Sequence, residues 1–290
     1  MKYGMTKEIF DSESSVDDII ITGLPRSGTT LLCMLLSEHE NVVALNEPMD
    51  KDLFKNHEDA IRNIETCFKN FRASLLESGK ALARTKNGNI TDNAYTPNSL
   101  SRQREVRRTE IQFSKKLDSQ FTLAMKHCAE FTLLFPEILE KYSVFAVIRN
   151  PLALLGSWNS VNVPVSRGRV AKAQKLNKWL FDKLENMGND ILGRQLFIMS
   201  WYFEQFKLLS SERIIRYEDI VTKPSWTISR ISGRELSGKY PEMSNKNTSD
   251  YYDSEFLKIA GPRLLESEGS YWDFYSREDI INIIDEGNRG

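Results

Sequence analysis

The stretch IIITGLPRSGTTLL, residues 19–32, decides the fold of this chain. An apolar strand runs into a loop bounded by Gly23 and Gly28, and the loop runs into an apolar helix. In a loop of this kind, the backbone amides and the positive end of the following helix hold an anionic group. The stretch therefore predicts a phosphate-binding loop.

The cation of this loop is not where a Walker A loop has it. The Walker pattern places lysine directly before the hydroxyl residue, whereas this chain has Thr29 before Thr30 and carries Arg26 in mid-loop. The usual lysine reaches the outer phosphates of a triphosphate, and an arginine in mid-loop lies over the innermost phosphate. The loop thus favours a donor with one phosphate and one transferable group over ATP.

A second anion site is predicted around Arg149. Residues 144–148 form a continuous apolar run, which indicates a buried parallel strand. The run is followed by Arg149, by Pro151 in a favourable place for a first helical turn, and by Ser157 two helical turns later. We expect Arg149 at the carboxyl end of its strand, beside the phosphate loop.

Three segments together resemble the sulfotransferases, which transfer a sulfuryl group from 3′-phosphoadenosine 5′-phosphosulfate (PAPS). The loop LPRSGTTLL resembles the family's 5′-phosphosulfate loop, and Arg149 with Ser157 keeps the residue types and spacing of its 3′-phosphate motif. The segment RIIRYEDIV, residues 213–221, resembles the family's Arg-Tyr-Glu-Asp-Leu strand and turn. The resemblance frames most of the chain, from about residue 18 to 224.

The resemblance implies a fold and a set of donor contacts. The fold is α/β, with three layers, α/β/α, around a central parallel sheet, like that of the P-loop nucleoside-triphosphate hydrolases. PAPS would be the co-substrate, without a metal. The residues implied in binding it are those of the loop, the 3′-phosphate pair and a tyrosine near the adenine: Pro25, Arg26, Ser27, Gly28, Thr29, Thr30, Arg149, Ser157 and Tyr217.

Four residues are catalytic candidates. Arg26 and Lys126 would stabilise charge on the departing phosphate, because electrostatic stabilisation carries most of such group transfers. Two residues compete as the base that takes the acceptor's proton. Glu47 resembles the catalytic glutamate of the tyrosylprotein and glycan branches, and His127 resembles the catalytic histidine of the cytosolic small-molecule branch. The mid-loop arginine is more like the first pair of branches and favours Glu47.

Strands alternate with helices along the sequence, and we expect one domain over residues 1–290. We expect residues 50–118 to form a largely helical, polar insertion on the acceptor side. The stretch 72–116 is locally basic, which is typical of a solvated face and also suits an anionic acceptor. The resemblance implies a hydroxyl-bearing acceptor, which we expect to be a peptidyl tyrosine, a glycan or a small molecule.

Composition limits the binding partners and the cellular location that we expect for this chain. A net charge of −1 over 290 residues gives no sign of nucleic-acid binding. The three cysteines lack metal-ligand spacing and do not make a disulfide framework, which favours a reduced, cytoplasmic location. No apolar run has the length of a signal-peptide core at the N-terminus or of a membrane span anywhere. The oligomeric state is left open.

Two alternatives stay open on the sequence. A nucleotide or sugar kinase with an altered loop would need magnesium and a strand that ends in a carboxylate. A non-catalytic phosphate-loop protein would keep the loop without the chemistry. The family's Arg-Lys-Gly segment near the C-terminus is not found, and Gly261-Pro262-Arg263 is a poor substitute for it.

Overall fold

The computed structural model of the chain describes residues 18–96, 102–235 and 240–287. Its centre is a five-stranded parallel sheet in the order β2-β5-β1-β6-β7. The strands are β1 (Asp18–Gly23), β2 (Val42–Asn46), β5 (Thr122–Lys126), β6 (Ser143–Ile148) and β7 (Ile214–Arg216). The predicted α/β fold with a central parallel sheet is confirmed.

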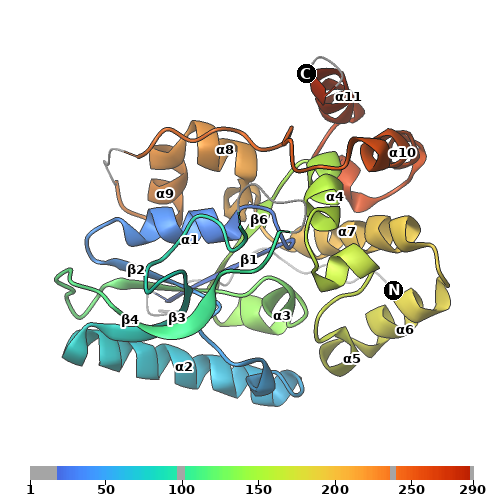
Figure 1. Cartoon of the computed structure of the whole chain (residues 1–290). Helices are drawn as coiled ribbons and strands as arrows, with labels where there is room; N and C mark the ends of the chain where they lie inside the picture. The colour runs from blue at the N-terminus through green and yellow to red at the C-terminus, as the bar shows by residue number, and fades with distance from the viewer. Residues whose placement is uncertain (1–17, 97–101, 236–239, 288–290) are drawn as a thin grey trace, which may run out of the picture.

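Helices cover both faces of the sheet (Figure 1). On one side lie α1 (Thr29–Ser37), α8 (Tyr217–Thr222) and α9 (Pro224–Ser232), and on the other lie α2 (His57–Ser78) and α3 (Ala129–Thr132). The remaining helices are α4 (Pro151–Asn159), α5 (Ala173–Leu176), α6 (Lys178–Asn186), α7 (Ile191–Phe206), α10 (Ser254–Glu266) and α11 (Arg277–Gly287), with short 3₁₀ turns between elements.

Strand β1 shows why the sheet needs both layers. Ile19 and Ile21 pack into the apolar cluster of α1, α8 and α9, whereas Ile20 packs into the larger cluster that includes α2, α3 and α7. Side chains of a strand alternate between faces, so a strand that is apolar at every position is stable only when both faces are covered. The continuous apolar runs of the sequence are thus explained by the three layers.

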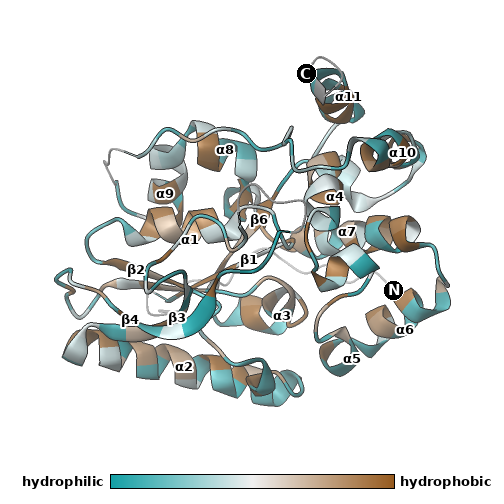
Figure 2. Cartoon of the chain, in the orientation of Figure 1, coloured by the Kyte–Doolittle hydropathy of each residue, from teal (hydrophilic) through white to brown (hydrophobic). Residues whose placement is uncertain are grey.

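The stretch 50–118 is less helical than expected. Helix α2 fills its first part and buries one face through Ala60, Ile64 and Phe68, so hydrophobic and hydrophilic residues alternate along it (Figure 2). Gly79, with φ 70°, ends this helix. The chain then forms an antiparallel pair, β3 (Lys80–Thr85) and β4 (Arg107–Gln112), where helix was expected.

The physical reason for this correction is visible in β3. Its residues alternate between buried and more exposed positions, with Ala81, Ala83 and Thr85 inside. Small and charged residues make this alternation weak as a strand signal, because strand propensity is carried mainly by β-branched and aromatic residues. No helix of the described ranges is both long and apolar enough to cross a membrane.

Candidate functional site

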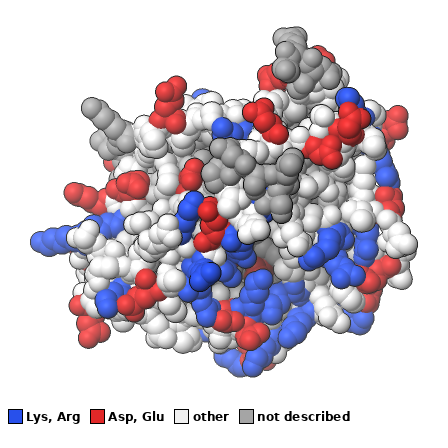
Figure 3. Space-filling model, in the orientation of Figure 1, with Lys and Arg blue, Asp and Glu red and all other residues white. Residues whose placement is uncertain are grey.

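All five strands of the sheet deliver residues to one cavity of about 480 Å³ at their carboxyl ends. The residues that line it directly after a strand are Pro25 and Arg26, Glu47, Lys126 with Cys128, Arg149, and Tyr217. Lys and Arg side chains gather around a hollow on this face of the molecule (Figure 3). The carboxyl edge of an open parallel sheet is the usual place for a ligand.

The phosphate loop is shaped by its backbone. Gly28 has φ 98° and precedes the first residue of α1, and a Cβ there would lie 2.6 Å from Cδ2 of Tyr217. Arg26 itself has φ 72°, and the amide of Ser27 donates to the carbonyl of Leu24 at 3.1 Å. The left-handed residues turn the loop back under the helix N-terminus, which is the geometry that binds anions.

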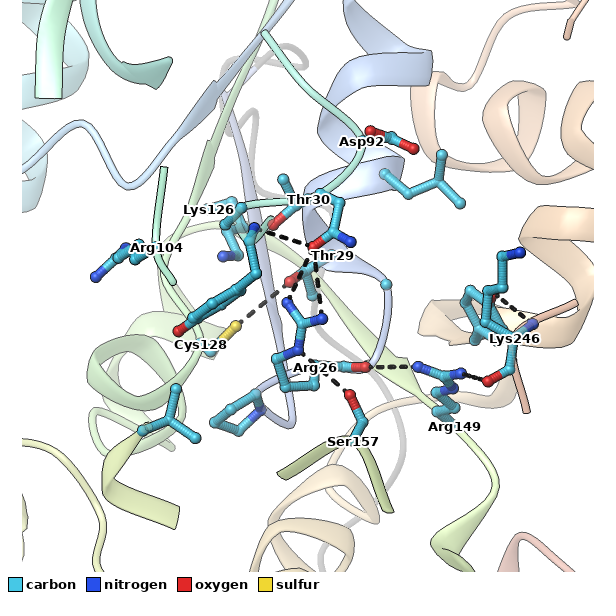
Figure 4. A pocket seen from close by; sticks show the side chains of 18 of the residues that line it. Arg26, Thr29, Thr30, Asp92, Arg104, Lys126, Cys128, Arg149, Ser157 and Lys246 are labelled. Atoms are coloured by element: carbon cyan, nitrogen blue, oxygen red, sulfur yellow. Dashed lines mark hydrogen bonds between the residues drawn. The ribbon is translucent and has the colours of Figure 1, made fainter. Parts of the chain in front are cut away.

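Arg26 projects from this loop into the cavity (Figure 4). Its Nε donates to Oγ of Ser157 at 3.3 Å, and its two Nη atoms lie 3.4 and 3.5 Å from Oδ1 of Asn93. The guanidinium also lies over the ring of Tyr95, 4.7 Å from the centroid. Burial, followed by the charges of Arg102 and Arg149, lowers the pKa of Arg26 to about 10.

Arg149 reaches the same loop from β6 and is 5% exposed. Its Nη1 donates to the Arg26 carbonyl at 3.1 Å, and its Nε donates to Oδ1 of Asn247 at 2.9 Å. Its Nη2 donates to the Lys246 carbonyl at 2.5 Å and to the hydroxyl of Tyr252 at 3.0 Å. Its guanidinium lies 4.2 Å from the ring centroid of Tyr217. The sequence prediction that Arg149 stands beside the loop is correct in position.

Within the described ranges, neither Arg26 nor Arg149 forms an ion pair with a carboxylate. Every hydrogen bond of the two guanidiniums ends on a carbonyl, an amide oxygen or a hydroxyl. A buried charge without a counter-ion is costly, and an anion supplied by a ligand removes that cost. The pair therefore makes an anion site.

Lys126 and Glu47 form a second charged group in the cavity. The Lys126 Nζ is 3.2 Å from Oε1 of Glu47 and 3.2 Å from Oδ1 of Asn46. Glu47 also pairs with Arg84 Nε at 2.6 Å and with Arg104 Nη2 at 2.9 Å. One carboxylate thus faces three cations.

The two partners hold each other in the charged state. Burial by itself would raise the pKa of Glu47, but Lys126, Arg104 and Arg84 outweigh it and hold that pKa well below its usual range. Burial would lower the pKa of Lys126, yet the neighbouring Cys128 and Glu47 groups raise it. The Cys128 thiol is neutral near pH 7 because burial raises its own pKa, so Glu47 is the partner that carries charge.

His127 is not part of the cavity lining. Its ring packs between Phe54 and Phe131, with centroids 5.3 and 5.1 Å away, and its Nε2 accepts from the amide of Met49 at 3.3 Å. Burial lowers the pKa of His127 to about 3. The next residue, Cys128, faces the cavity instead, with its Sγ 3.4 Å from Oγ1 of Thr29.

The other donor-site candidates fall into two groups. Pro25, Gly28, Thr29, Thr30 and Ser157 line the cavity, as does Tyr217. Ser27 does not, and its Oγ is buried without a hydrogen-bond partner. Ser27, which the sequence predicted as a donor contact, therefore does not face the cavity.

Sequence reasoning missed two segments that line the site. Lys246 and Tyr252 line the cavity and accept hydrogen bonds from Arg149, and Asn93 and Tyr95 contact Arg26. None of these residues follows a strand of the sheet or belongs to a motif, so the sequence carried no signal for them. Arg263 was considered as a C-terminal phosphate contact, but it pairs with Asp190 and lies outside the cavity lining.

A family model described as the sulfotransferase domain matches residues 16–241. Among solved structures, the sulfotransferase domain of the Synechococcus PCC 7002 olefin synthase is 13% identical, with 93% of each chain covered and a TM-score of 0.36. Sulfotransferase STF1 from Mycobacterium tuberculosis H37Rv is 15% identical, with 93% of this chain and 76% of that chain covered and a TM-score of 0.36. The sulfotransferase from Alicyclobacillus acidocaldarius is 12% identical, with 89% and 98% covered and a TM-score of 0.37.

No curated protein matches the sequence. The family model, in contrast, covers well over half of the chain and includes the phosphate loop, Arg149 and Tyr217. The protein therefore belongs to the sulfotransferase domain family and is an enzyme that transfers a sulfuryl group.

Proposed function

We propose that the protein transfers the sulfuryl group of PAPS to a hydroxyl acceptor bound in the cavity described above. The family uses PAPS, and the observation that carries the proposal is the pair of cations, Arg26 and Arg149, that meet without a carboxylate partner among the described residues. PAPS carries a phosphate at each end of its ribose, and both would find a cation here.

The residues present fit this donor. The backbone amides of Gly28, Thr29 and Thr30 and the hydroxyls of Thr29 and Thr30 would hold the 5′-phosphosulfate at the N-terminus of α1. Arg149 and Ser157, with the neighbouring Lys246, would hold the 3′-phosphate. Tyr217, whose ring packs against Gly28 and Arg149, would lie beside the adenine.

The transfer itself needs positive charge where the phosphate departs. The acceptor oxygen forms a bond to sulfur while the bond from sulfur to the phosphate oxygen breaks, and adenosine 3′,5′-bisphosphate leaves. Arg26 and the ammonium of Lys126 would stabilise the charge that develops on that oxygen, which is the main contribution expected from a site of this kind. Glu47 keeps Lys126 charged and in place.

Glu47 is the residue we propose to take the acceptor's proton. Glu47 lines the cavity. His127, in contrast, is enclosed by aromatic rings and does not line the cavity. The three cations around Glu47 make it a weak base in the resting site. An acceptor hydroxyl would therefore have to replace the contact with Arg104, the most exposed of the three, before the proton moves.

Three further properties of the protein belong to this proposal. We infer one sulfotransferase domain over residues 1–290, a cytoplasmic location and no requirement for a metal. The insertion at residues 50–118 contributes Asn93, Tyr95, Arg102 and Arg104 to the cavity lining, which supports a role on the acceptor side.

The direct test is calorimetric binding of adenosine 3′,5′-bisphosphate to the wild-type protein, compared with ATP in the presence of magnesium. We expect tighter binding of the bisphosphate, with no effect of metal. Adenosine 5′-monophosphate is the matched control, because it lacks only the 3′-phosphate.

Other results of this binding experiment would favour the alternative functions. A preference for magnesium ATP would support the kinase alternative. Binding of neither nucleotide would support a phosphate loop that no longer binds a donor. Equal affinity for the bisphosphate and the monophosphate would remove the 3′-phosphate role of Arg149 and Ser157.

A further inference from the structure

One wall of the cavity is built by elements that carry none of the donor motifs. It includes Ala129 and Glu130 of α3, Val163 and Val165 beside the turn that follows α4, and Tyr202 of α7. The aliphatic members make most of this wall apolar. Two polar groups stand within it, the hydroxyl of Tyr202 and the carboxyl of Glu130.

The hydroxyl of Tyr202 is buried and has no hydrogen-bond partner. The side chain is 0% exposed and its ring is fixed by Trp201 and Phe206, with centroids 5.2 and 6.0 Å away. A buried tyrosine normally finds a partner for its hydroxyl, because an unsatisfied polar group is destabilising. A ligand in the cavity that Tyr202 lines would supply the missing partner.

Glu130 lies in the same wall and is 7% exposed. Among the described residues, the basic group within ion-pair distance of Glu130 is Nδ1 of His127 at 3.9 Å, and His127 is uncharged at neutral pH because burial lowers its pKa to about 3. Burial, followed by the charge of Glu47, raises the pKa of Glu130 itself. The carboxyl is thus a hydrogen-bonding group without a charged partner at this wall.

The size of the cavity limits what can bind here. About 480 Å³ lies within the range of small-molecule sites. The donor must share this space with the acceptor, so the part of the acceptor that enters is compact. A glycan would place several of its hydroxyls against the side chains of Val163, Val165 and Ala129, which cannot form hydrogen bonds with them.

We propose that the acceptor is a compact, mainly apolar molecule with a second hydrogen-bonding group, an uncharged hydroxyl or an amine, which Tyr202 and Glu130 bind while its other hydroxyl is sulfated. The inference rests on the proposed function, since it names the acceptor of that same site. A carboxylate in place of the second group would meet the Glu130 carboxyl and bind less well.

The test uses three probes of one shape in the presence of saturating adenosine 3′,5′-bisphosphate. They are cyclohexanol, trans-1,4-cyclohexanediol and 4-hydroxycyclohexanecarboxylate, titrated by ligand-observed nuclear magnetic resonance. We expect the diol to bind about fivefold more tightly than cyclohexanol, as one added hydrogen bond allows. The carboxylate should bind more weakly than the diol.

Tyr202→Phe removes only the unpartnered hydroxyl. We expect it to abolish the preference for the diol while the protein keeps its thermal stability and its affinity for the bisphosphate. Tyr271→Phe is the matched control, because Tyr271 is also fully buried but its hydroxyl lies 2.6 Å from Oγ of Ser267. The control should lose stability and keep the diol preference.

Equal binding of diol and cyclohexanol by the wild type, or an unchanged preference in Tyr202→Phe, would overturn the assignment. If none of the three probes binds, the proposal that the acceptor is compact and mainly apolar is wrong. A loss of thermal stability in Tyr202→Phe like that of the control would show that the hydroxyl has a partner within the protein. In each case, retained binding of the bisphosphate leaves the proposed donor function standing, and loss of that binding in the wild type would overturn the donor function instead.

Discussion

A single residue, Arg149, contacts three parts of the site. It binds the backbone of the phosphate loop, the segment at Lys246 and Asn247, and the face of Tyr217. None of these partners carries negative charge toward it, so its charge remains available for a phosphate. The residue is therefore both a positioning element and the proposed ligand of the 3′-phosphate.

Arg149→Ala should weaken the binding of adenosine 3′,5′-bisphosphate by about 1.5 to 3 kcal/mol, the value of a hydrogen bond to a charged group. Calorimetry would measure the loss. Arg216→Ala is a matched control, because Arg216 ends the neighbouring strand and also lies over a tyrosine ring, that of Tyr275, but does not line the cavity. If both variants bind like the wild type, the 3′-phosphate assignment is wrong.

Glu47→Gln should lower turnover by about 10² to 10⁴-fold, the usual contribution of a general base. The loss should be large for sulfation of phenol and small for 4-nitrophenol, which is already largely ionised near neutral pH and has little need of a base. His127→Asn should not separate the two acceptors, because His127 does not reach the cavity. An equal loss for both phenols in Glu47→Gln would instead assign Glu47 to the placement of Lys126.

At the scale of elements, α4 links the two ends of the donor site. Asn150 caps this helix by accepting hydrogen bonds from the amides of Leu152 and Ala153, and Ser157 lies two turns later. The cap therefore sets where the Ser157 hydroxyl meets Arg26. A substitution of Asn150 should therefore change the binding of the donor.

Asn150→Ala should cost about 1 kcal/mol of stability, as expected for loss of an N-cap. It should also weaken binding of the bisphosphate, because the frayed helix start displaces Ser157. Asn177→Ala is the matched control: Asn177 caps α6 by accepting a hydrogen bond from the amide of Leu180, and neither it nor any residue of α6 lines the cavity. Thermal unfolding and calorimetry together check this, and the prediction fails if both variants keep the same affinity as the wild type.

The elements also show what the sequence could and could not predict. Long apolar runs such as 144–148 and the glycine-bounded loop identify the sheet and the donor edge, because burial on both faces dictates their composition. The pair β3 and β4 was missed because its strand signal lies in small and charged residues. Asn93 and Lys246 were missed because contacts made by loops depend on the finished fold.

His127 shows the same limit within the site. A residue that follows Lys126 at a strand end can face either the cavity or the core, and spacing alone does not distinguish them. In the structure His127 packs in the core, and Cys128 lines the cavity. Lys126 and Glu47 were located correctly because Lys126 is the last residue of β5 and Glu47 directly follows β2, both at the carboxyl edge.

At the scale of the whole molecule, charge is unevenly distributed. The net charge is −1, yet Arg26, Arg149, Lys126 and Arg104 all line one cavity. Binding of the bisphosphate should therefore weaken as ionic strength rises, because salt screens the attraction between these cations and the charged ligand as it approaches from solvent. Titration at several salt concentrations would check this, with an uncharged nucleoside, adenosine, as the control whose weaker binding should not change. A salt-independent affinity for the bisphosphate would contradict the role of the cations.

Buried groups should also set how the stability of the whole chain depends on pH. In the folded state burial lowers the pKa of His127 to about 3, whereas an unfolded histidine titrates near 6.5. Above about pH 6.5 both states leave His127 neutral, and its contribution to stability is complete. As the pH falls toward the folded pKa, the unfolded state binds the proton first, so the free energy of unfolding falls by roughly 1.4 kcal/mol for each pH unit.

Urea unfolding at pH 7, 6 and 5 would measure this dependence in the wild type and in His127→Asn. The variant should be less stable at pH 7, because it disturbs the packing against Phe54 and Phe131, and its stability should depend less steeply on pH. His39→Asn is a comparison from the other side of the sheet, where His39 lies beside Tyr240: burial also lowers the pKa of His39, so this variant should lose its own, separate share of the pH dependence. If the free energy of unfolding depends on pH equally in His127→Asn and in the wild type, His127 takes up its proton in the folded state. His127 would then again be a candidate for the general base.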